Sequence, residues 1–281
     1  MRLGVAALLG LAAAMPVLAM RESQVELSLS GGEAVSARVQ TPRQAGSPLP
    51  AVMLFGGFER GDTVLDLIQG GRPKVMATFQ YPLDIPDDAR GWALWRALPA
   101  ARRAIHHTLD GMGALHRHLQ AMPEVDPERI TVVGVSLGAP FAVIAAAEHD
   151  IPGLAVIHGF GKVDEVIAHQ FGRRWARHRG DWVWAPAGLL GRLLNWYARI
   201  PSVEAHAARL RADQHAWMLA AEDDRRLPAD ATRALREGFE QSQARFDFAT
   251  ETGGHLRGGD DPRIPGLLRQ VEAWMVAQDL H

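Results

Sequence analysis

Short apolar runs recur along this 281-residue chain, and longer amphipathic stretches separate most of them. Runs rich in Val, Ile, Leu and Met are typical of strands that are buried on both faces of a sheet. Such strands are expected at residues 51–55, 75–79, 130–135, 154–157 and 216–221, and a last strand with alternating polarity at 245–249. Residues 25–40 alternate around a Gly-Gly turn, which predicts an antiparallel hairpin.

The stretches between these strands place apolar residues three and four positions apart, as a helix with one buried face does. Predicted helices cover residues 62–69, 92–122, 139–147, 202–212, 230–239 and 265–277. Strands that alternate with helices indicate the α/β class, with a mostly parallel sheet, helices on both faces and the hairpin as an antiparallel edge. Residues 20–281 are therefore expected to form one α/β domain.

The strand predicted at 130–135 leads directly into Gly134-Val135-Ser136-Leu137-Gly138, and a helix is expected to begin there. A serine at the tip of a sharp strand-to-helix turn has a strained backbone, and the helix must pass close to the strand. Glycine at 134 and 138 permits this close approach. The pattern predicts a nucleophile elbow that holds the Ser136 hydroxyl over a helix N-terminus. The alternative is a Gly-rich turn with an unreactive serine.

A nucleophilic serine needs a base and a third group that orients the base. Open parallel sheets bind their ligands at the carboxyl ends of the strands, so these groups are expected directly after downstream strands. His255 follows the last predicted strand, and an acidic cluster at 222–224 follows the strand before it. The resulting chain order is serine, acid, histidine.

With these residues the sequence resembles the α/β-hydrolase superfamily, in which the triad occurs in this order. The resemblance rests on residues 134–138, 221–228 and 254–255 and extends over the whole predicted domain. It implies the α/β-hydrolase fold and acyl transfer to Ser136, with His255 as the base.

The resemblance also selects the acid. Family members commonly carry Gly-x-x-Asp-x-x-Val-Pro in the acid loop, and here Ala221 replaces the glycine and Leu227 the valine. This alignment puts Asp224 at the acid position. Asp223 is one residue away and is the runner-up, and Asp164, which follows an earlier strand, is the third candidate.

Two backbone N–H groups are expected to form an oxyanion hole. One belongs to Leu137, the residue after the nucleophile. The other is expected from the loop after the strand at 51–55, where Gly57 and Phe58 are the candidates and Phe58 is preferred. The family often has His-Gly at this place, which this chain lacks.

The composition of the chain excludes several kinds of catalytic and binding site. The chain has no cysteine, which excludes a thiol nucleophile, a thiolate metal site and disulfides. Its formal net charge of −2 gives no electrostatic case for nucleic acid. No cofactor or metal is expected, and the histidines of the long helix at 92–122 are interpreted as surface or packing residues. His158, which ends the strand at 154–157, is expected to support the site from behind.

The N-terminus has the pattern of an export signal. An arginine precedes a Leu/Ala-rich run, and Val17-Leu18-Ala19 ends it with small residues at the positions that signal peptidase prefers. We expect cleavage after Ala19 and a periplasmic or secreted protein. An uncleaved membrane anchor is the alternative.

Residues 161–201 interrupt the regular alternation of predicted strands and helices. They hold four of the eight tryptophans, Trp175, Trp182, Trp184 and Trp196, and six arginines. The segment is expected to be a helical cap whose tryptophans attach it to the helices beneath. The other interpretation is an acyl-binding lid whose arginines meet an anionic substrate group or a lipid headgroup.

A carboxylic ester is the expected substrate, because esters are the broadest use of the family. The same triad also serves thioesterases, acyltransferases and peptidases. A rival of another class is an exported, non-catalytic binding protein with this fold.

Overall fold

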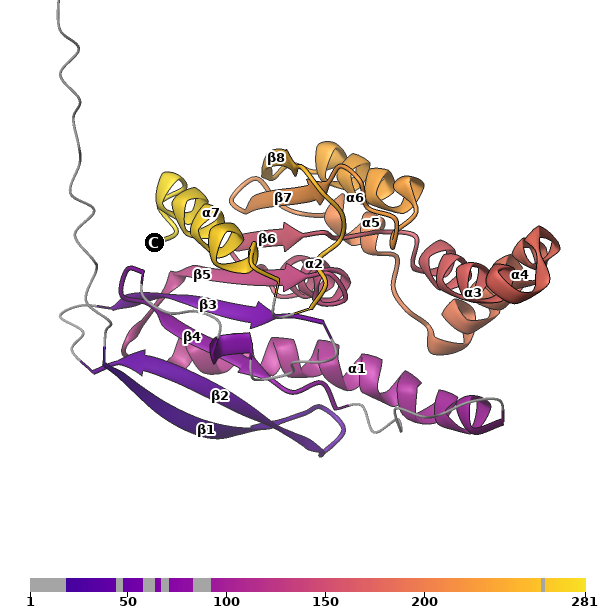
Figure 1. Cartoon of the computed structure of the whole chain (residues 1–281). Coiled ribbons are helices and arrows are strands. Elements are labelled where there is room, and N and C mark those ends of the chain that lie inside the picture. Colours follow the sequence, from indigo (N-terminus) through magenta and orange to yellow (C-terminus); the bar gives the residue numbers. More distant parts are fainter. Residues whose placement is uncertain (1–18, 44–47, 58–63, 67–70, 83–91, 259–260) are drawn as a thin grey trace, which may run out of the picture.

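A computed structural model describes residues 19–43, 48–57, 64–66, 71–82, 92–258 and 261–281. Eight strands form one sheet in the order β1-β2-β4-β3-β5-β6-β7-β8 (Figure 1). The strands are β1 (Met20–Ser28), β2 (Ala34–Pro42), β3 (Leu49–Phe55), β4 (Val75–Phe79), β5 (Val125–Val135), β6 (Gly153–Ile157), β7 (His215–Ala221) and β8 (Arg245–Glu251). β1, β2 and β4 pair antiparallel, and all other neighbours are parallel. The predicted fold class, including its antiparallel edge, is confirmed.

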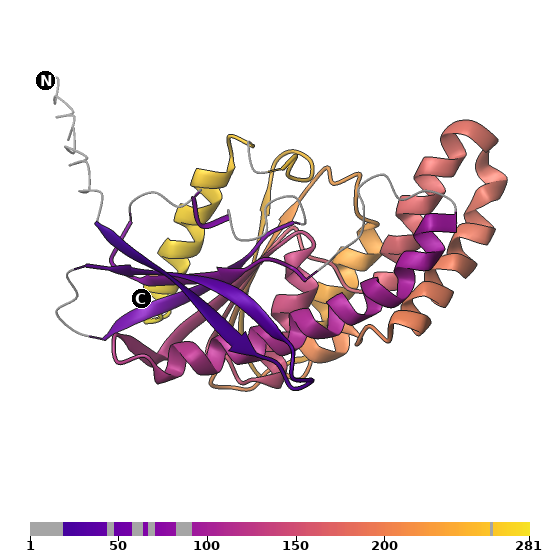
Figure 2. The same ribbon diagram turned by 90° about the horizontal axis from the view of Figure 1, so that it is seen from below.

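Helices cover both faces of this sheet (Figure 2). They are α1 (Trp92–Ala121), α2 (Gly138–Glu148), α3 (Val163–Arg179), α4 (Trp184–Ala198), α5 (Val203–Ala207), α6 (Ala229–Gln241) and α7 (Ile264–Ala277), with a 3-10 turn, η2 (Asp181–Val183), before α4. Within the described residues, no helix is both long and apolar enough to span a membrane. The signal or anchor predicted before Ala19 lies outside them.

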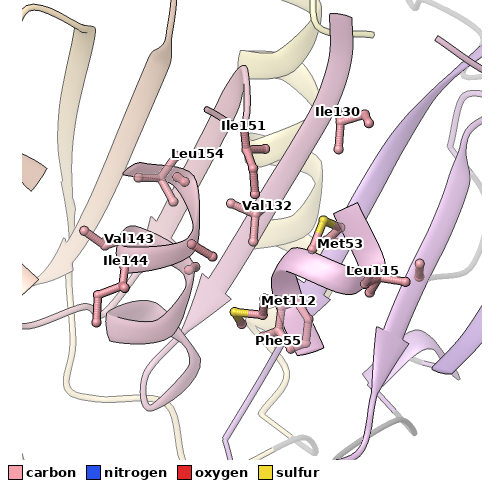
Figure 3. Packing of buried hydrophobic residues seen from close by; sticks show 14 of the residues in the cluster. Met53, Phe55, Met112, Leu115, Ile130, Val132, Val143, Ile144, Ile151 and Leu154 are labelled. Carbon is pink, nitrogen blue, oxygen red and sulfur yellow. The ribbon is translucent and has the colours of Figure 1, made fainter. Parts of the chain in front are cut away.

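Two apolar cores lie on opposite faces of the sheet because successive side chains of a strand point in opposite directions. Met53 and Phe55 of β3 pack into the larger core with Met112 and Leu115 of α1 (Figure 3). Val52 and Leu54, their neighbours in the strand, face α7 in the second core. The central strands are thus buried on both sides, which agrees with their uninterrupted apolar runs.

Three helix predictions need correction. Pro99 predicts an interruption or a start of the long helix at 92–122, because proline lacks a backbone N–H, but α1 continues through it as one helix. α5 ends at Ala207 instead of near residue 212, because the chain tightens into three-residue turns and the Gln214 side chain then accepts the Arg211 N–H at 2.9 Å. Of the helix predicted at 62–69, residues 64–66 form a 3-10 turn and the rest lies outside the described residues.

Between β6 and β7, α3 and α4 form a helical hairpin that projects beyond the sheet (Figures 1 and 2). Small residues make its inner contact. A Cβ atom on Gly191 of α4 would lie only 2.3 Å from the Asp164 carbonyl of α3. Trp184 packs against Gly172, but Trp182 and Trp196 are exposed, so the prediction that they attach the segment to the helices beneath is wrong. With glycine and alanine at the contact, the large side chains are left on the outer face.

Candidate active site

Ser136 lies between the end of β5 and the start of α2 with φ of +53°, the left-handed region that costs a non-glycine residue energy. Its N–H donates to the Ile157 carbonyl at 2.8 Å, which ties the turn to the next strand. A Cβ on Gly138 would lie 2.2 Å from the Phe55 carbonyl oxygen, and one on Gly134 2.6 Å from Ala139. The glycines therefore permit the close approach that raises Ser136 at the sheet edge.

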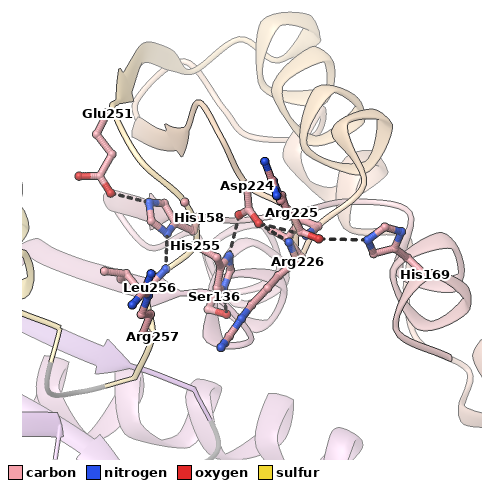
Figure 4. Close-up of polar contacts among 12 residues, drawn as sticks. Ser136, His158, His169, Asp224, Arg225, Arg226, Glu251, His255, Leu256 and Arg257 are labelled. Carbon is pink, nitrogen blue, oxygen red and sulfur yellow. Dashed lines mark hydrogen bonds and ion pairs between the residues drawn. The ribbon is translucent and has the colours of Figure 1, made fainter. Parts of the chain in front are cut away.

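The structure brings Ser136, His255 and Asp224 together from three separate loops (Figure 4). The Ser136 Oγ lies 2.7 Å from His255 Nε2, and His255 Nδ1 lies 2.6 Å from Asp224 Oδ2. A carboxylate only accepts, so Nδ1 carries the proton and Nε2 is left as the acceptor for the serine hydroxyl. This tautomer is the one that a general base for Ser136 requires.

Asp224 is held as a carboxylate. Its Oδ1 accepts the N–H groups of Arg226 at 2.8 Å and Leu227 at 3.1 Å, while Oδ2 faces His255. Burial raises the pKa of Asp224, but the His255 contact and these two N–H groups outweigh it, and the pKa lies below its ordinary value. Asp224 therefore stays ionised at neutral pH and can stabilise a protonated His255.

The two other acids considered from the sequence lie elsewhere. Asp223 is exposed, and its backbone N–H donates to the Gly253 carbonyl. Asp164 lies in the first turn of α3. The acid that contacts His255 is the one that the acid-loop alignment selects.

His158 lies behind the catalytic candidates, with its ring 5.3 Å from the His255 ring. Its Nε2 donates to Glu251 at 2.8 Å. Its Nδ1 accepts, at 3.3 Å, the N–H of Leu256, the residue that follows His255 in the chain. Burial lowers the pKa of His158, and the neighbouring His255 lowers it further against the opposing effect of Glu251. A neutral His158 thus anchors the backbone beside His255, a supporting role that agrees with the expectation.

Glu251 and Arg263 complete this support and were not identified from the sequence. Arg263 Nη1 donates to Glu251 at 3.1 Å and to the Gly254 carbonyl at 2.9 Å, and its Nη2 pairs with Asp261 at 2.8 Å. The loop that carries His255 is therefore fastened on both sides. No local pattern predicts these contacts, since they join residues that meet only when the loop folds back.

Leu137, one of the expected oxyanion donors, directly follows the nucleophile in the chain. Leu137 caps the N-terminus of α2, where the first N–H groups lack partners within the helix. Gly57 ends the described part of the β3 loop, and the Tyr81 hydroxyl donates to the Gly56 carbonyl at 2.7 Å, which holds the peptide that carries the Gly57 N–H. Phe58, the preferred candidate, lies outside the described residues.

A cavity of about 840 Å³ opens over Ser136 and His255. Its floor includes Leu137 and Leu227, and its walls come partly from α3 and from Trp184. Arg173, Arg177 and Arg226 also line it, and none of the described lining residues carries a carboxylate. The cavity lining thus combines apolar side chains with positive charge.

His158, Asp224 and His255 present ligand atoms within 4.8 Å of one another, a spacing that a metal ion could use. Their hydrogen bonds already account for this proximity, because both nitrogens of His158 and of His255 have protein partners. These three residues are therefore better described as a hydrogen-bonded group around His255 than as the ligands of a metal ion.

Comparison with solved structures shows the α/β-hydrolase fold. An acetyl xylan esterase from Paenibacillus sp. R4 superposes with a TM-score of 0.62 at 15% identity, covering 93% of this chain and 86% of that one. A cold-adapted esterase from an Arctic intertidal metagenomic library gives 0.57 at 15% identity over 91% and 93%. A prolyl endopeptidase gives 0.60 at 19% identity over 93% of this chain but 39% of its own. No family model and no curated protein sequence matches this chain.

Proposed function

We propose that this protein is a serine hydrolase that cleaves carboxylic esters through a Ser136 acyl-enzyme. The observation that carries the proposal is the relay from Ser136 Oγ through His255 to Asp224, with contacts of 2.7 and 2.6 Å. Nucleophile, base and orienting acid have the tautomer and charge that acyl transfer needs. The strained elbow and the adjacent helix N-terminus are further support.

In this mechanism the Ser136 oxygen attacks the ester carbonyl while His255 Nε2 takes its proton. The tetrahedral oxyanion is held by the Leu137 N–H and by a second N–H from Gly57 or Phe58. Protonated His255, stabilised by Asp224, then gives its proton to the departing alkoxide. A water molecule activated by His255 attacks the acyl-enzyme, and its breakdown restores the serine.

The choice of ester over the alternatives rests on likeness. Several structural neighbours are described as esterases, which supports this leaving group. The prolyl endopeptidase neighbour has the same fold, so the fold alone does not separate esters from peptides. Thioesterase, acyltransferase and peptidase activities therefore stay as alternatives on the same residues.

Labelling with a fluorophosphonate probe tests the nucleophile. We expect the wild-type chain to be labelled and Ser136→Ala to be unlabelled. Ser202→Ala is expected to be labelled like the wild type, because the Ser202 hydroxyl accepts the Ala205 N–H at the start of α5 and not a histidine. Labelling of Ser136→Ala at the wild-type level would refute the role of Ser136. An unlabelled, folded wild-type chain would favour the non-catalytic binding protein.

A substrate panel then separates the leaving groups. p-Nitrophenyl esters of rising chain length, the matching acyl thioesters and a prolyl peptide are compared at equal enzyme concentration. We expect the highest kcat/KM on an ester, and faster turnover of a thioester or peptide would move the assignment to that class.

We also propose that the reaction takes place outside the cytoplasm, on the strength of the signal pattern at 1–19.

A further inference from the structure

The outer face of α4 exposes large apolar side chains in one stripe. Leu189, Leu193 and Trp196 recur at four- and three-residue spacing and are 61%, 51% and 77% exposed. Trp182 lies in η2, directly before α4, and is 67% exposed. Single exposed apolar residues are ordinary, but four large ones on one hairpin, two of them tryptophans, mark a surface that something covers. We name these four residues the α4 stripe.

The hairpin that carries the α4 stripe is strongly positive. Residues 171–199 contain six arginines and one acidic residue, which gives this segment a formal charge of +5. Since the whole chain has a net charge of −2, the remaining residues together carry −7. All six arginines are exposed, and none of them forms an ion pair within the described residues. Positive charge is therefore concentrated on the same hairpin that carries the exposed tryptophans.

We propose that the α4 stripe docks this protein on an anionic lipid surface. A helix with Trp and Leu on one face and arginines beside them lies in the plane of a membrane interface, with the rings at headgroup depth and the guanidinium groups on the phosphates. Arg192 lies between Leu189 and Trp196 in the sequence of α4, and Arg179 lies three residues before Trp182. The positive charge of the hairpin favours an anionic surface over a neutral apolar protein face, and exposed tryptophans beside arginines are typical of a helix at a lipid interface.

The docked orientation has a consequence for the cavity. Val166 and Gln170 of α3 and Trp184 of α4 line the cavity over Ser136, while the residues of the α4 stripe are exposed on the same hairpin. A membrane that covers the stripe would therefore lie beside the wall of the cavity. The docking itself does not depend on the proposed catalysis, since none of the stripe residues belongs to the Ser136 relay.

Vesicle flotation tests the proposal with the full chain. We expect wild-type protein to float with vesicles that contain phosphatidylglycerol, to float poorly with phosphatidylcholine alone, and to be released by salt. Trp182→Ser/Trp196→Ser is expected to weaken binding at least about tenfold through the lost apolar contact. Arg179→Gln/Arg192→Gln is expected to weaken it about 30-fold, since each basic residue near the surface contributes roughly a fivefold factor.

Matched controls isolate the hairpin. Arg233→Gln/Arg236→Gln removes the same charge from α6 and is expected to leave vesicle binding unchanged. All variants share one N-terminus, so the apolar run at residues 1–19 contributes equally to each. Hydrolysis of a soluble ester and the melting temperature, expected to match the wild type, show that the hairpin variants are folded.

Two results would overturn the proposal. One is wild-type protein that does not float with anionic vesicles, or stripe variants that float as well as the wild type. The other is a wild-type dimer in solution that Trp182→Ser/Trp196→Ser converts to a monomer, which would identify a second copy of this chain as the occupant. Loss of ester hydrolysis with intact vesicle binding would count against the proposed function alone.

Discussion

Removing the Tyr81 hydroxyl tests whether a buried side chain holds the loop after β3, which we propose carries the second oxyanion donor. Tyr81 donates to the Gly56 carbonyl at 2.7 Å, and its ring packs 6.4 Å from Phe55 and 5.9 Å from Phe141. Burial raises the pKa of Tyr81 well above its ordinary value, so the phenol keeps its proton and remains a donor. Tyr81→Phe deletes one oxygen atom and keeps the ring.

Two effects of different size are expected from Tyr81→Phe. A buried carbonyl left without its donor costs about 1–3 kcal/mol of unfolding free energy. Loss of one oxyanion donor typically lowers kcat by about 10²–10³, and a displaced donor costs less, so we expect kcat to fall roughly 10- to 100-fold. KM should change little, because the donor acts on charge that develops in the transition state.

The assay pairs kcat on a p-nitrophenyl ester with urea unfolding, and Thr78→Val is the control. Thr78 is also buried and donates to a β-strand carbonyl, that of Leu54, at 2.6 Å. Thr78→Val should therefore cost similar stability while leaving kcat near the wild-type value. If Tyr81→Phe loses stability like Thr78→Val and retains full kcat, Tyr81 has only a packing role and the reasoning is refuted.

Two further predictions concern stability. Gly138→Ala would place a Cβ 2.2 Å from the Phe55 carbonyl oxygen and should lower the free energy of unfolding, measured with urea, by at least about 2 kcal/mol. Gly188→Ala, in open space on α4, should raise it by about 0.5–1 kcal/mol. Equal effects of the two substitutions would contradict the close approach at the elbow. The hydrogen bond from Arg263 holds the pKa of Asp261 below its ordinary value. The Asp261 carboxylate therefore stabilises the fold at pH values above about 4, the pKa of an unfolded aspartate, and this contribution is lost as the pH falls below that value. Asp261→Asn should be less stable than wild type near neutral pH, with a difference that shrinks below about pH 4; a difference independent of pH would exclude the carboxylate charge as its source.

Parts of the site were predictable because each rests on a local pattern. Gly134 and Gly138 indicate the close turn around Ser136, and the position of His255 after the last strand follows from where parallel strands end. The choice of Asp224 over Asp223 depended on the spacing of one loop. Its two backbone N–H contacts, from Arg226 and Leu227, give that spacing a physical reason, since they turn the carboxylate toward His255.

Other features could not be read from the chain because they depend on tertiary contacts. The support of the His255 loop by Glu251 and Arg263 joins side chains that meet only in the folded loop. The exposure of Trp182 and Trp196 was mispredicted, because a tryptophan-rich segment is ordinarily buried. Here Gly191 contacts α3 and Ala187 is buried, and the sequence pattern does not say which face of α4 turns inward.

The sequence distance between the relay members has a consequence for how the protein folds. Ser136 and His255 are 119 residues apart in the chain, and β5 and β8, which lead to them, are separated in the sheet by β6 and β7. Contacts between residues this far apart in the chain form slowly, because a long loop must close first. The relay can form only after β6 and β7 have docked between the two strands. We therefore expect reaction of a probe at Ser136 to report a late stage of refolding, after β5 to β8 have assembled.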